Sequence, residues 1–257
     1  MFSSDTYYNI FVKDQLFIRS IRIDDKVSKD SYPYDIPSIS FLIDNTLYFN
    51  KKVTFFIGEN GSGKSTVIEA LALCCGFNAE GGTRNFSFST SNSHSDLYKH
   101  LIVSKGAHFK DGFFLRAESF YNVASYIDEI DKEGFGRPII DSYGGISLHH
   151  QSHGESFMAL VRNRFSGQGL YLLDEPEAAV SPERLMQLLV RIHDLEKDSQ
   201  FLICTHSPIL MSYPGAEIYE LNAEGIRSVK YKETRHYQIT RDFIERPEAM
   251  YRYLFEE

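Results

Sequence analysis

The chain has 257 residues, 42% of them hydrophobic and 24% charged, which is the composition of an ordinary globular protein able to bury one sizeable core. Its formal charge of −8 and pI near 5.6 argue against broad electrostatic binding to nucleic acid or to an anionic membrane. It contains no run of about 18 apolar residues and no signal-peptide pattern, so we expect a cytoplasmic protein without a transmembrane segment.

Short apolar stretches alternate with turns in the first part of the chain, as in "LFIRSIRIDD" and "SISFLIDNTLYF". Such alternation predicts an antiparallel β part over residues 1–57. This part ends in a run of β-branched and aromatic residues from Val53 to Ile57, which has the length of a strand.

A glycine-rich loop follows this strand. Residues 58–65, "GENGSGKS", match the pattern G-x-x-x-x-G-K-[ST] at every required position, and helix formers come next. Glycines let the backbone wrap closely around a phosphate, so that successive amides and the helix N-terminus face the anion. The predicted nucleotide contacts are Gly58, Glu59, Asn60, Gly61, Ser62, Gly63, Lys64, Ser65 and Thr66.

The last two positions of this pattern carry side-chain chemistry. We expect Lys64 to reach the β- and γ-phosphates of ATP and Ser65 to offer its hydroxyl to Mg²⁺. The expected ligands of the chain are therefore ATP and Mg²⁺.

Residues 149–156, "HHQSHGES", crowd three histidines and a glutamate around one glycine. Imidazoles beside a carboxylate are ordinary zinc ligands, but the spacing is that of neither a helical pair nor a zinc finger. The residues concerned are His149, His150, His153 and Glu155. The alternative is a phosphate-facing loop around Ser152 and Gly154 at the start of a helix, which apolar residues continue at helical spacing.

A second apolar strand, Leu170 to Leu173, ends in Asp174 and Glu175. A buried parallel strand would place both carboxylates at the carboxyl edge of the sheet, where α/β sheets bind ligands. We expect Asp174 to orient Mg²⁺ and Glu175 to polarise the attacking water.

A third apolar strand, Phe201 to Cys204, leads into Thr205 and His206. A histidine directly after a buried strand can donate a hydrogen bond to the γ-phosphate and so sense its presence. The predicted catalytic residues are Lys64, Glu175 and His206.

The order of these elements resembles the ABC-type ATPases, a class of P-loop NTPases. Their signature, L-S-G-G-Q, stands shortly before the acidic strand, and "QSHGESFMALVRNRF" occupies that place. The resemblance implies that Ser152 and Gly154 complete the nucleotide site of a second copy of the chain, in an ATP-dependent head-to-tail homodimer.

More closely, the chain resembles short, stand-alone bacterial predicted ATPases related to the SMC and RecF group. The similar stretches include "TFFIGENGSGKST", "DGFFLRAESF", "QSHGESF", "LYLLDEPEAAVSP" and "THSPIL". This likeness implies nucleotide binding and ATP hydrolysis, but it does not indicate a partner.

Two features of ABC-type ATPases have no clear counterpart in the sequence. No glutamine occurs from Thr66 to His150, although the family places a Mg²⁺-binding glutamine there. The side chains that could offer an oxygen instead are Asn85, Asn92 and Ser119. The aromatic that stacks on adenine is also open, with Tyr32 and Tyr34 as candidates by position.

We therefore expect one α/β domain over residues 1–257, with a mostly parallel core sheet flanked by helices. The antiparallel part precedes the phosphate loop, and residues 81–150 form a small arm that ends at the signature. Residues 151–257 hold the signature, the acidic strand and His206. They continue into a hairpin that turns at Asn222 to Gly225 and a closing helix, Ile239 to Phe255, interrupted before Pro247.

The expected function is an ATP-driven switch that regulates or powers an unidentified cytoplasmic protein partner. Two alternatives stay open at this point. One is the motor subunit of a membrane transporter. The other is a DNA-repair or chromosome-type ATPase that lacks a coiled coil, for which nucleic acid would be the partner although the charge does not favour it.

Overall fold

A six-stranded sheet forms the centre of the molecule in this computed structural model, which describes residues 15–28, 31–84, 95–134, 137–178 and 180–255. The strand order is β5-β6-β7-β3-β8-β9, and every neighbouring pair is parallel except β8 and β9. The bounds are Asp111–Arg116 (β5), Gly169–Asp174 (β6), Gln200–Cys204 (β7), Val53–Ile57 (β3), Glu217–Asn222 (β8) and Gly225–Ser228 (β9). The expected mostly parallel core sheet is confirmed.

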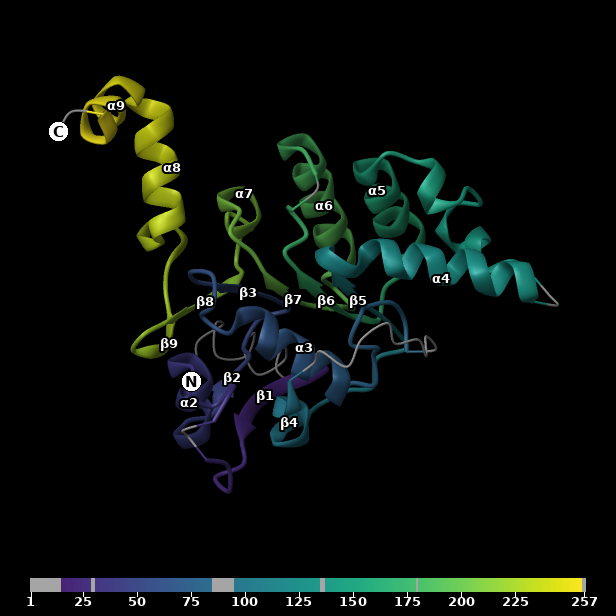
Figure 1. Ribbon diagram of the computed structural model, residues 1–257, viewed down its shortest axis with the longest axis horizontal. Coiled ribbons are helices and arrows are strands. Elements are labelled where there is room, and N and C mark those ends of the chain that lie inside the picture. The colour runs from purple at the N-terminus through teal and green to yellow at the C-terminus, as the bar shows by residue number, and fades with distance from the viewer. Residues whose placement is uncertain (1–14, 29–30, 85–94, 135–136, 179, 256–257) are drawn as a thin grey trace, which may run out of the picture.

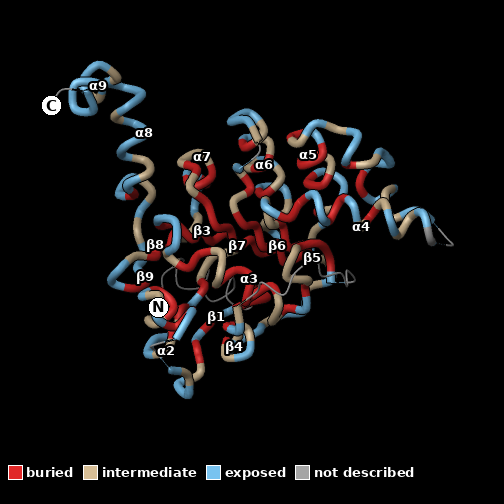
Figure 2. Tube along the Cα trace, in the orientation of Figure 1, coloured by how far each residue is buried: buried red, intermediate tan, exposed pale blue. Residues whose placement is uncertain are grey.

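The central strands are buried on both faces of this sheet. Every residue of β3, β6 and β7 is buried, which explains why their sequences are continuous apolar runs. Successive side chains point to opposite faces, so Phe55 and Ile203 pack into one core while Phe56 and Leu202 pack into the other. Figure 2 shows this buried layer running through the middle of the molecule.

One face of the sheet is covered by α3 (Lys64–Cys74) and a second, smaller sheet (Figure 1). The smaller sheet is antiparallel, in the order β2-β1-β4, with bounds Leu47–Tyr48, Ile18–Ile23 and Leu101–Lys105. Helix α3 contacts β4 on one side and β6 and β7 on the other, so it lies between the two sheets. The predicted antiparallel part is therefore present.

The strand expected within "SISFLIDNTLYF" is wrong for most of its length. The segment instead forms helix α2 (Pro37–Asp44), and only Leu47–Tyr48 is extended. Pro37 stands at the start of the helix, where its missing amide hydrogen costs nothing and its fixed φ favours helical geometry. Ile39 and Leu42 are buried on the inner side of the helix.

The other face of the large sheet is covered by four helices (Figure 1). Their bounds are Phe120–Glu133 (α4), His153–Arg164 (α5), Pro182–Leu195 (α6) and Pro208–Met211 (α7). Helix α6 begins after Ser181 and buries Leu185, Leu188 and Ile192. Short 3₁₀ turns occupy Asp96–Lys99, Ala117–Ser119, Ile139–Tyr143, Leu148–His150 and Tyr231–Glu233.

The region expected to form a small arm, residues 81–150, contributes to both sheets. It supplies β4 to the antiparallel sheet and β5 to the edge of the large sheet. The part of this region that resembles an arm is α4 with the turns that follow it (Figure 1).

The C-terminal region begins with the expected hairpin, because β8 and β9 pair antiparallel around Asn222 and Gly225. Two helices then follow, α8 (Arg235–Glu245) and α9 (Pro247–Phe255), so the predicted interruption before Pro247 is confirmed. Neither helix buries a residue, and both stand away from the sheet (Figure 1). Within the described ranges, every helix is too short or too polar to cross a bilayer.

Candidate active site

The glycine-rich loop lies at the carboxyl end of β3, directly before α3. Gly58, Gly61 and Gly63 have φ angles of 147°, 79° and 92°, a region that side chains with a β-carbon rarely adopt. A β-carbon on Gly58 would also lie 2.3 Å from the Leu221 carbonyl oxygen. The loop therefore requires glycine at these positions. A loop of this conformation lets successive backbone amides face a phosphate.

The predicted contact residues occupy the loop and the first turn of α3. Gly58, Gly63 and Lys64 are buried, Ser62, Ser65 and Thr66 are half-buried, and Glu59, Asn60 and Gly61 are exposed. The Lys64 ammonium donates to the carbonyl oxygens of Gly58 and Glu59, each at 3.0 Å. Its positive charge is therefore held at the loop, as a phosphate-binding lysine requires.

Ser65 and Asp174 meet at the edge of the sheet. The Ser65 hydroxyl donates to Asp174 Oδ1 at 3.0 Å, and Asp174 ends β6 and is only 5% exposed. Burial raises the pKa of Asp174 to about 6, against the lowering effects of Ser65 and Arg116. A hydroxyl beside a buried carboxylate is an oxygen donor set that fits a hard divalent cation such as Mg²⁺.

Glu175 follows in an uncommon backbone conformation, with φ of 51°. Its amide donates to the Cys204 carbonyl oxygen at 3.0 Å, which ties the end of β6 to the end of β7. Its carboxylate Oε1 lies 3.6 Å from His206 Nε2. The two side chains that sequence reasoning assigned to water activation and phosphate sensing are therefore neighbours.

The loop after β7 is held by Glu177, which sequence reasoning missed. One oxygen of its carboxylate accepts hydrogen bonds from the Thr205 hydroxyl and the His206 amide. This fixes the backbone that carries the His206 imidazole.

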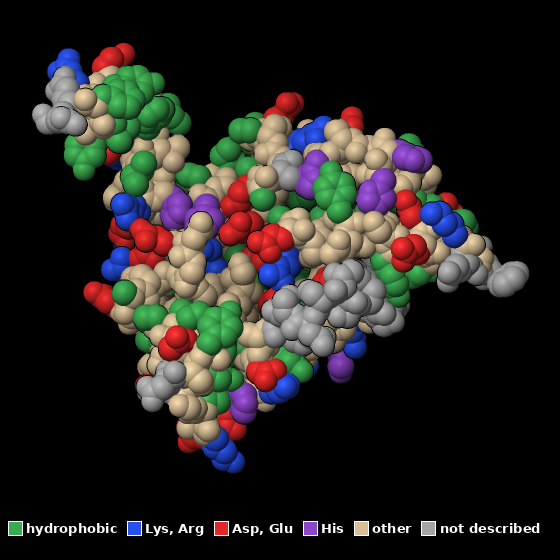
Figure 3. All heavy atoms as spheres, viewed as in Figure 1, with side chains coloured by type: hydrophobic (Ala, Val, Ile, Leu, Met, Phe, Trp, Pro, Cys, Tyr) green, Lys and Arg blue, Asp and Glu red, His purple; other side chains and the backbone are tan. Residues whose placement is uncertain are grey.

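A cavity of about 240 Å³ opens beside these groups and is lined by Ser65, Glu118, His153, Asp174 and Glu175, together with Ala117 and Ala178. Glu118 is the second residue after β5, within the 3₁₀ turn Ala117–Ser119, and its side chain is 85% exposed. Sequence reasoning missed this carboxylate, although an acidic residue close to the end of an apolar strand is the kind of signal that identified Asp174 and Glu175. In the view of Figure 3, acidic, basic and histidine side chains gather in the middle of the molecular surface.

Of the side chains considered for the missing glutamine, only one is described. The hydroxyl of Ser119 donates to the Glu80 carbonyl oxygen and is not among the groups that line the cavity. Asn85 and Asn92 lie outside the described residues. For adenine, Tyr34 is 6% exposed and packs edge-on against His100, while Tyr32 is 68% exposed.

The stretch "HHQSHGES" forms the start of α5, with Ser152 as the N-cap residue. The carboxylate of Glu155 accepts hydrogen bonds from the Ser152 amide and hydroxyl, in a capping box. Gly154 leaves room for Arg184, because a β-carbon there would lie 1.6 Å from the guanidinium. Ser152 is exposed, so the helix start faces outward.

Two histidines of this stretch, His149 and His153, have aromatic or polar partners. His149 stacks on Tyr121 and shares a hydrogen bond with Ser125, while His153 packs edge-on against Tyr121. Among the described residues, no group of three or more His, Cys, Asp or Glu side chains is arranged to hold a metal ion. The zinc interpretation therefore gains no support from the described part of the chain.

The other side of the phosphate loop borders a cavity of about 520 Å³ that also involves the C-terminal region. Residues Gly58 to Ser62 line it together with Ile36, Arg235 and His236. Arg235 Nη1 lies 2.8 Å from Glu59 Oε1, and His236 Nε2 lies 3.1 Å from His206 Nδ1. Sequence reasoning assigned no role to Arg235 or His236.

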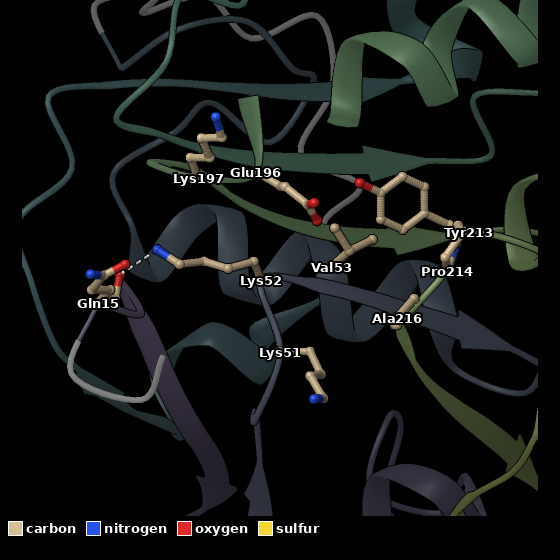
Figure 4. A pocket seen from close by; sticks show the side chains of 10 residues that line it. Gln15, Lys51, Lys52, Val53, Glu196, Lys197, Tyr213, Pro214 and Ala216 are labelled. Atoms are coloured by element: carbon tan, nitrogen blue, oxygen red, sulfur yellow. Dashed lines mark hydrogen bonds between the residues drawn. The ribbon is translucent and has the colours of Figure 1, made fainter. Parts of the chain in front are cut away.

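A further cavity, of about 430 Å³, lies at the opposite edge of the sheet (Figure 4). Lys51, Lys52 and Lys197 line it near the amino ends of β3 and β7, and Lys52 donates to the Gln15 carbonyl oxygen at 3.0 Å. Parallel α/β sheets bind ligands at the carboxyl ends of their strands, so the phosphate-loop edge is the better nucleotide site.

Two family models match this chain. Residues 39–133 match a model described as "AAA domain", and residues 147–212 match one described as "AAA domain, putative AbiEii toxin, Type IV TA system". These matches confirm the resemblance to ABC/AAA-like P-loop ATPases. No curated protein matches the chain.

Solved structures of low sequence identity are also similar. The protein cbiO1 of the ABC transporter complex cbiONQ from Clostridium perfringens is 12% identical, with 91% of this chain and 97% of that chain covered and a TM-score of 0.48. The SMC head domain from Thermotoga maritima is 16% identical, with 84% and 99% covered and a TM-score of 0.42. At these values we transfer no function from either structure.

Proposed function

We propose that this chain, as an ABC/AAA-like P-loop ATPase, binds MgATP at the carboxyl edge of its large sheet and hydrolyses it to switch a cytoplasmic protein partner. The observation that carries the proposal is the meeting of three pieces at one edge. These are the Lys64 ammonium in the glycine loop, the Ser65–Asp174 pair and the Glu175–His206 pair.

The proposed reaction is attack of water on the γ-phosphorus of ATP, with cleavage of its bond to the β–γ bridging oxygen and release of ADP and phosphate. Glu175 accepts the proton of the attacking water. Lys64 neutralises charge on the β- and γ-phosphates, and His206 donates a hydrogen bond to the γ-phosphate.

Ser65 and Asp174 are the residues that would hold Mg²⁺, which when bound neutralises charge on the phosphate oxygens. We place Glu118 in the role of the missing glutamine, because it is a further oxygen donor that lines the cavity beside Ser65 and Asp174. Being a carboxylate, it adds negative charge that a neutral amide would not.

The proposed active form is a head-to-tail dimer closed over two ATP molecules. The N-terminus of α5, where Ser152 is exposed and Gly154 is buried beside Arg184, would approach the γ-phosphate held by the other copy. ATP would thus act as a clamp between two copies, and hydrolysis would release it.

The variant Glu175→Gln tests the proposal, because it keeps size and hydrogen bonding but removes the base. It should bind ATP, hydrolyse it on the order of 10² to 10⁴ times more slowly, and accumulate as a dimer in MgATP. Phosphate release and light scattering with and without MgATP measure this. Glu183→Gln, an exposed change in the first turn of α6, is the matched control and should behave as wild type. Unchanged turnover in Glu175→Gln would exclude Glu175 as the base.

A further inference from the structure

The first turn of α8 reaches into the proposed phosphate site from the C-terminal region. His236 Nε2 lies 3.1 Å from His206 Nδ1, and the two ring centres are 5.3 Å apart. The contact joins the loop after β7 to a helix that begins about 30 residues later. The second nitrogen of His206, Nε2, faces Glu175 at 3.6 Å.

A hydrogen bond between two imidazoles couples their proton positions. One ring nitrogen must donate and the other must accept, so the pair has a defined arrangement of tautomers. If His236 donates from Nε2, then Nδ1 of His206 accepts and the proton of His206 stays on Nε2. That is the nitrogen on the side of Glu175, where the γ-phosphate is proposed to lie.

The surroundings of His236 favour its neutral form, which this arrangement needs. Burial lowers the pKa of His236, and the nearby His206 and Lys64 lower it further, against a raising effect of Glu220. His236 also lines the cavity that borders Gly58 to Ser62 of the phosphate loop. A neutral ring with one donor nitrogen is therefore expected at neutral pH.

A second link joins α8 to the phosphate loop. Arg235 Nη1 lies 2.8 Å from Glu59 Oε1, but these side chains are 72% and 81% exposed. Exposed ion pairs are screened by water and salt and contribute little. The histidine pair, which is partly buried and adjoins Glu175, is the stronger connection.

We propose that His236 is a positioning residue for His206: by donating to Nδ1 of His206, it keeps the Nε2 proton directed at the γ-phosphate and so couples α8 to the presence of that phosphate. This inference rests on the proposed ATPase function. ADP lacks the γ-phosphate, so the coupling distinguishes ATP from ADP. Because α8 and α9 stand away from the sheet, the coupled element is an exposed helical arm (Figure 1).

The test compares ATP and ADP binding in variants of His236. In His236→Ala, affinity for a non-hydrolysable ATP analogue should fall about tenfold, the effect of losing one hydrogen bond to a charged group, while affinity for ADP stays unchanged. His236→Gln, whose amide can donate from a similar position, should restore most of the preference. Gln238→Ala, an exposed change on the same helix, is the control and should bind both nucleotides as wild type does.

Amide hydrogen exchange of residues 235–245 gives a second readout. In the wild type, exchange should be slower with the ATP analogue than with ADP, and this difference should vanish in His236→Ala. If His236→Ala lost affinity for the ATP analogue and for ADP to the same degree, His236 would have a merely structural role and the inference would be overturned. The inference would also be overturned if His236→Ala bound both nucleotides as tightly as the wild type. A wild-type chain that binds neither nucleotide would instead refute the proposed function on which the inference rests.

Discussion

Lys64 and Lys52 flank β3 at its two ends and provide a matched pair for locating the nucleotide. Lys64 lies in the glycine loop, and Lys52 lines the cavity at the opposite edge (Figure 4). We expect Lys64→Ala to weaken MgATP binding by about a hundredfold, because two charge-assisted hydrogen bonds to phosphate are lost. The Lys52→Ala variant should bind MgATP as tightly as the wild type does. Equilibrium titration with a fluorescent ATP analogue measures both, and the reverse result would move the site to the amino edge of the sheet.

Glu118 tests how the chain replaces the missing glutamine. Its carboxylate lines the cavity beside Ser65 and Asp174. Glu118→Ala should weaken Mn²⁺ binding in the presence of ADP by about 10- to 100-fold, as loss of a supporting oxygen near a metal does. Glu118→Gln keeps an oxygen at this position, so its Mn²⁺ affinity should fall less than that of Glu118→Ala. Electron paramagnetic resonance of free Mn²⁺ measures this, and normal binding by Glu118→Ala would remove Glu118 from the metal side of the site.

At the scale of single elements, the junction between β5 and α5 depends on one carboxylate. Asp111 accepts hydrogen bonds from the Arg164 guanidinium, the Ser166 hydroxyl and the Tyr171 hydroxyl at 2.7 to 2.9 Å. Burial raises the pKa of Asp111, but the charge of Arg164 and these hydrogen bonds outweigh it, so the pKa lies below its ordinary value. The carboxylate is therefore charged in the folded protein at neutral pH.

Asp111→Asn should lower the free energy of unfolding by about 2 to 4 kcal/mol at pH 7, because it leaves the half-buried Arg164 without its counter-charge. Because the pKa of Asp111 is lower in the folded than in the unfolded protein, its carboxylate stabilises the fold at pH values above the unfolded pKa of about 4. This stabilisation is lost as the pH falls below that value and through the folded-state pKa. The difference from wild type should therefore be constant from pH 7 to about 5.5 and shrink below pH 4. Urea denaturation at each pH measures it. Asp141→Asn, which breaks an exposed pair with Arg137, should change stability by less than about 1 kcal/mol.

Elements that carry a strong local pattern could be predicted from the sequence. The strands β3, β6 and β7 are continuous apolar runs, and the loop between β3 and α3 has a spacing that few other structures require. Helix α2 differs from the predicted strand because its short apolar segment fits both the helical and the strand period, and Pro37 at its start is the local signal that favours a helix.

Contacts between distant segments could not be predicted in this way. The histidine pair joins His206 to His236, and no periodicity or motif relates these positions. Glu177, which follows β6, likewise accepts hydrogen bonds from Thr205 and His206 in the loop after β7. Such contacts depend on the path of the chain in three dimensions, which a reading of local patterns does not contain.

At the scale of the whole molecule, the proposed site is shared between two copies of the chain. His153 lines the cavity beside Ser65 of its own chain, whereas Ser152, the next residue before it, is not among the residues that line this cavity. The Ser152 hydroxyl is directed to Glu155 within its own capping box. A role for Ser152 at a phosphate therefore calls for a second copy, which the proposed dimer supplies.

Ser152→Arg places a bulky cation at this surface and should leave ATP binding to the monomer nearly intact while it blocks dimer closure and hydrolysis. The change also removes a helix cap, which costs about 1 kcal/mol. Ser152→Ala removes the same cap without adding bulk or charge, so any difference between the two variants reports on closure. Light scattering in MgATP and phosphate release measure the two effects.

Mixing variants separates action across the dimer from action within one chain. In a heterodimer of Lys64→Ala with Ser152→Arg, one site carries both lesions and the other has wild-type residues from each chain. Activity that returns on mixing two inactive variants requires Ser152 to serve the phosphate loop of the other copy. If Ser152 acted on its own chain, every site would keep a lesion and mixing would restore nothing. Full hydrolysis by Ser152→Arg alone would contradict both arrangements, because the N-terminus of α5 would then lie outside the reaction altogether.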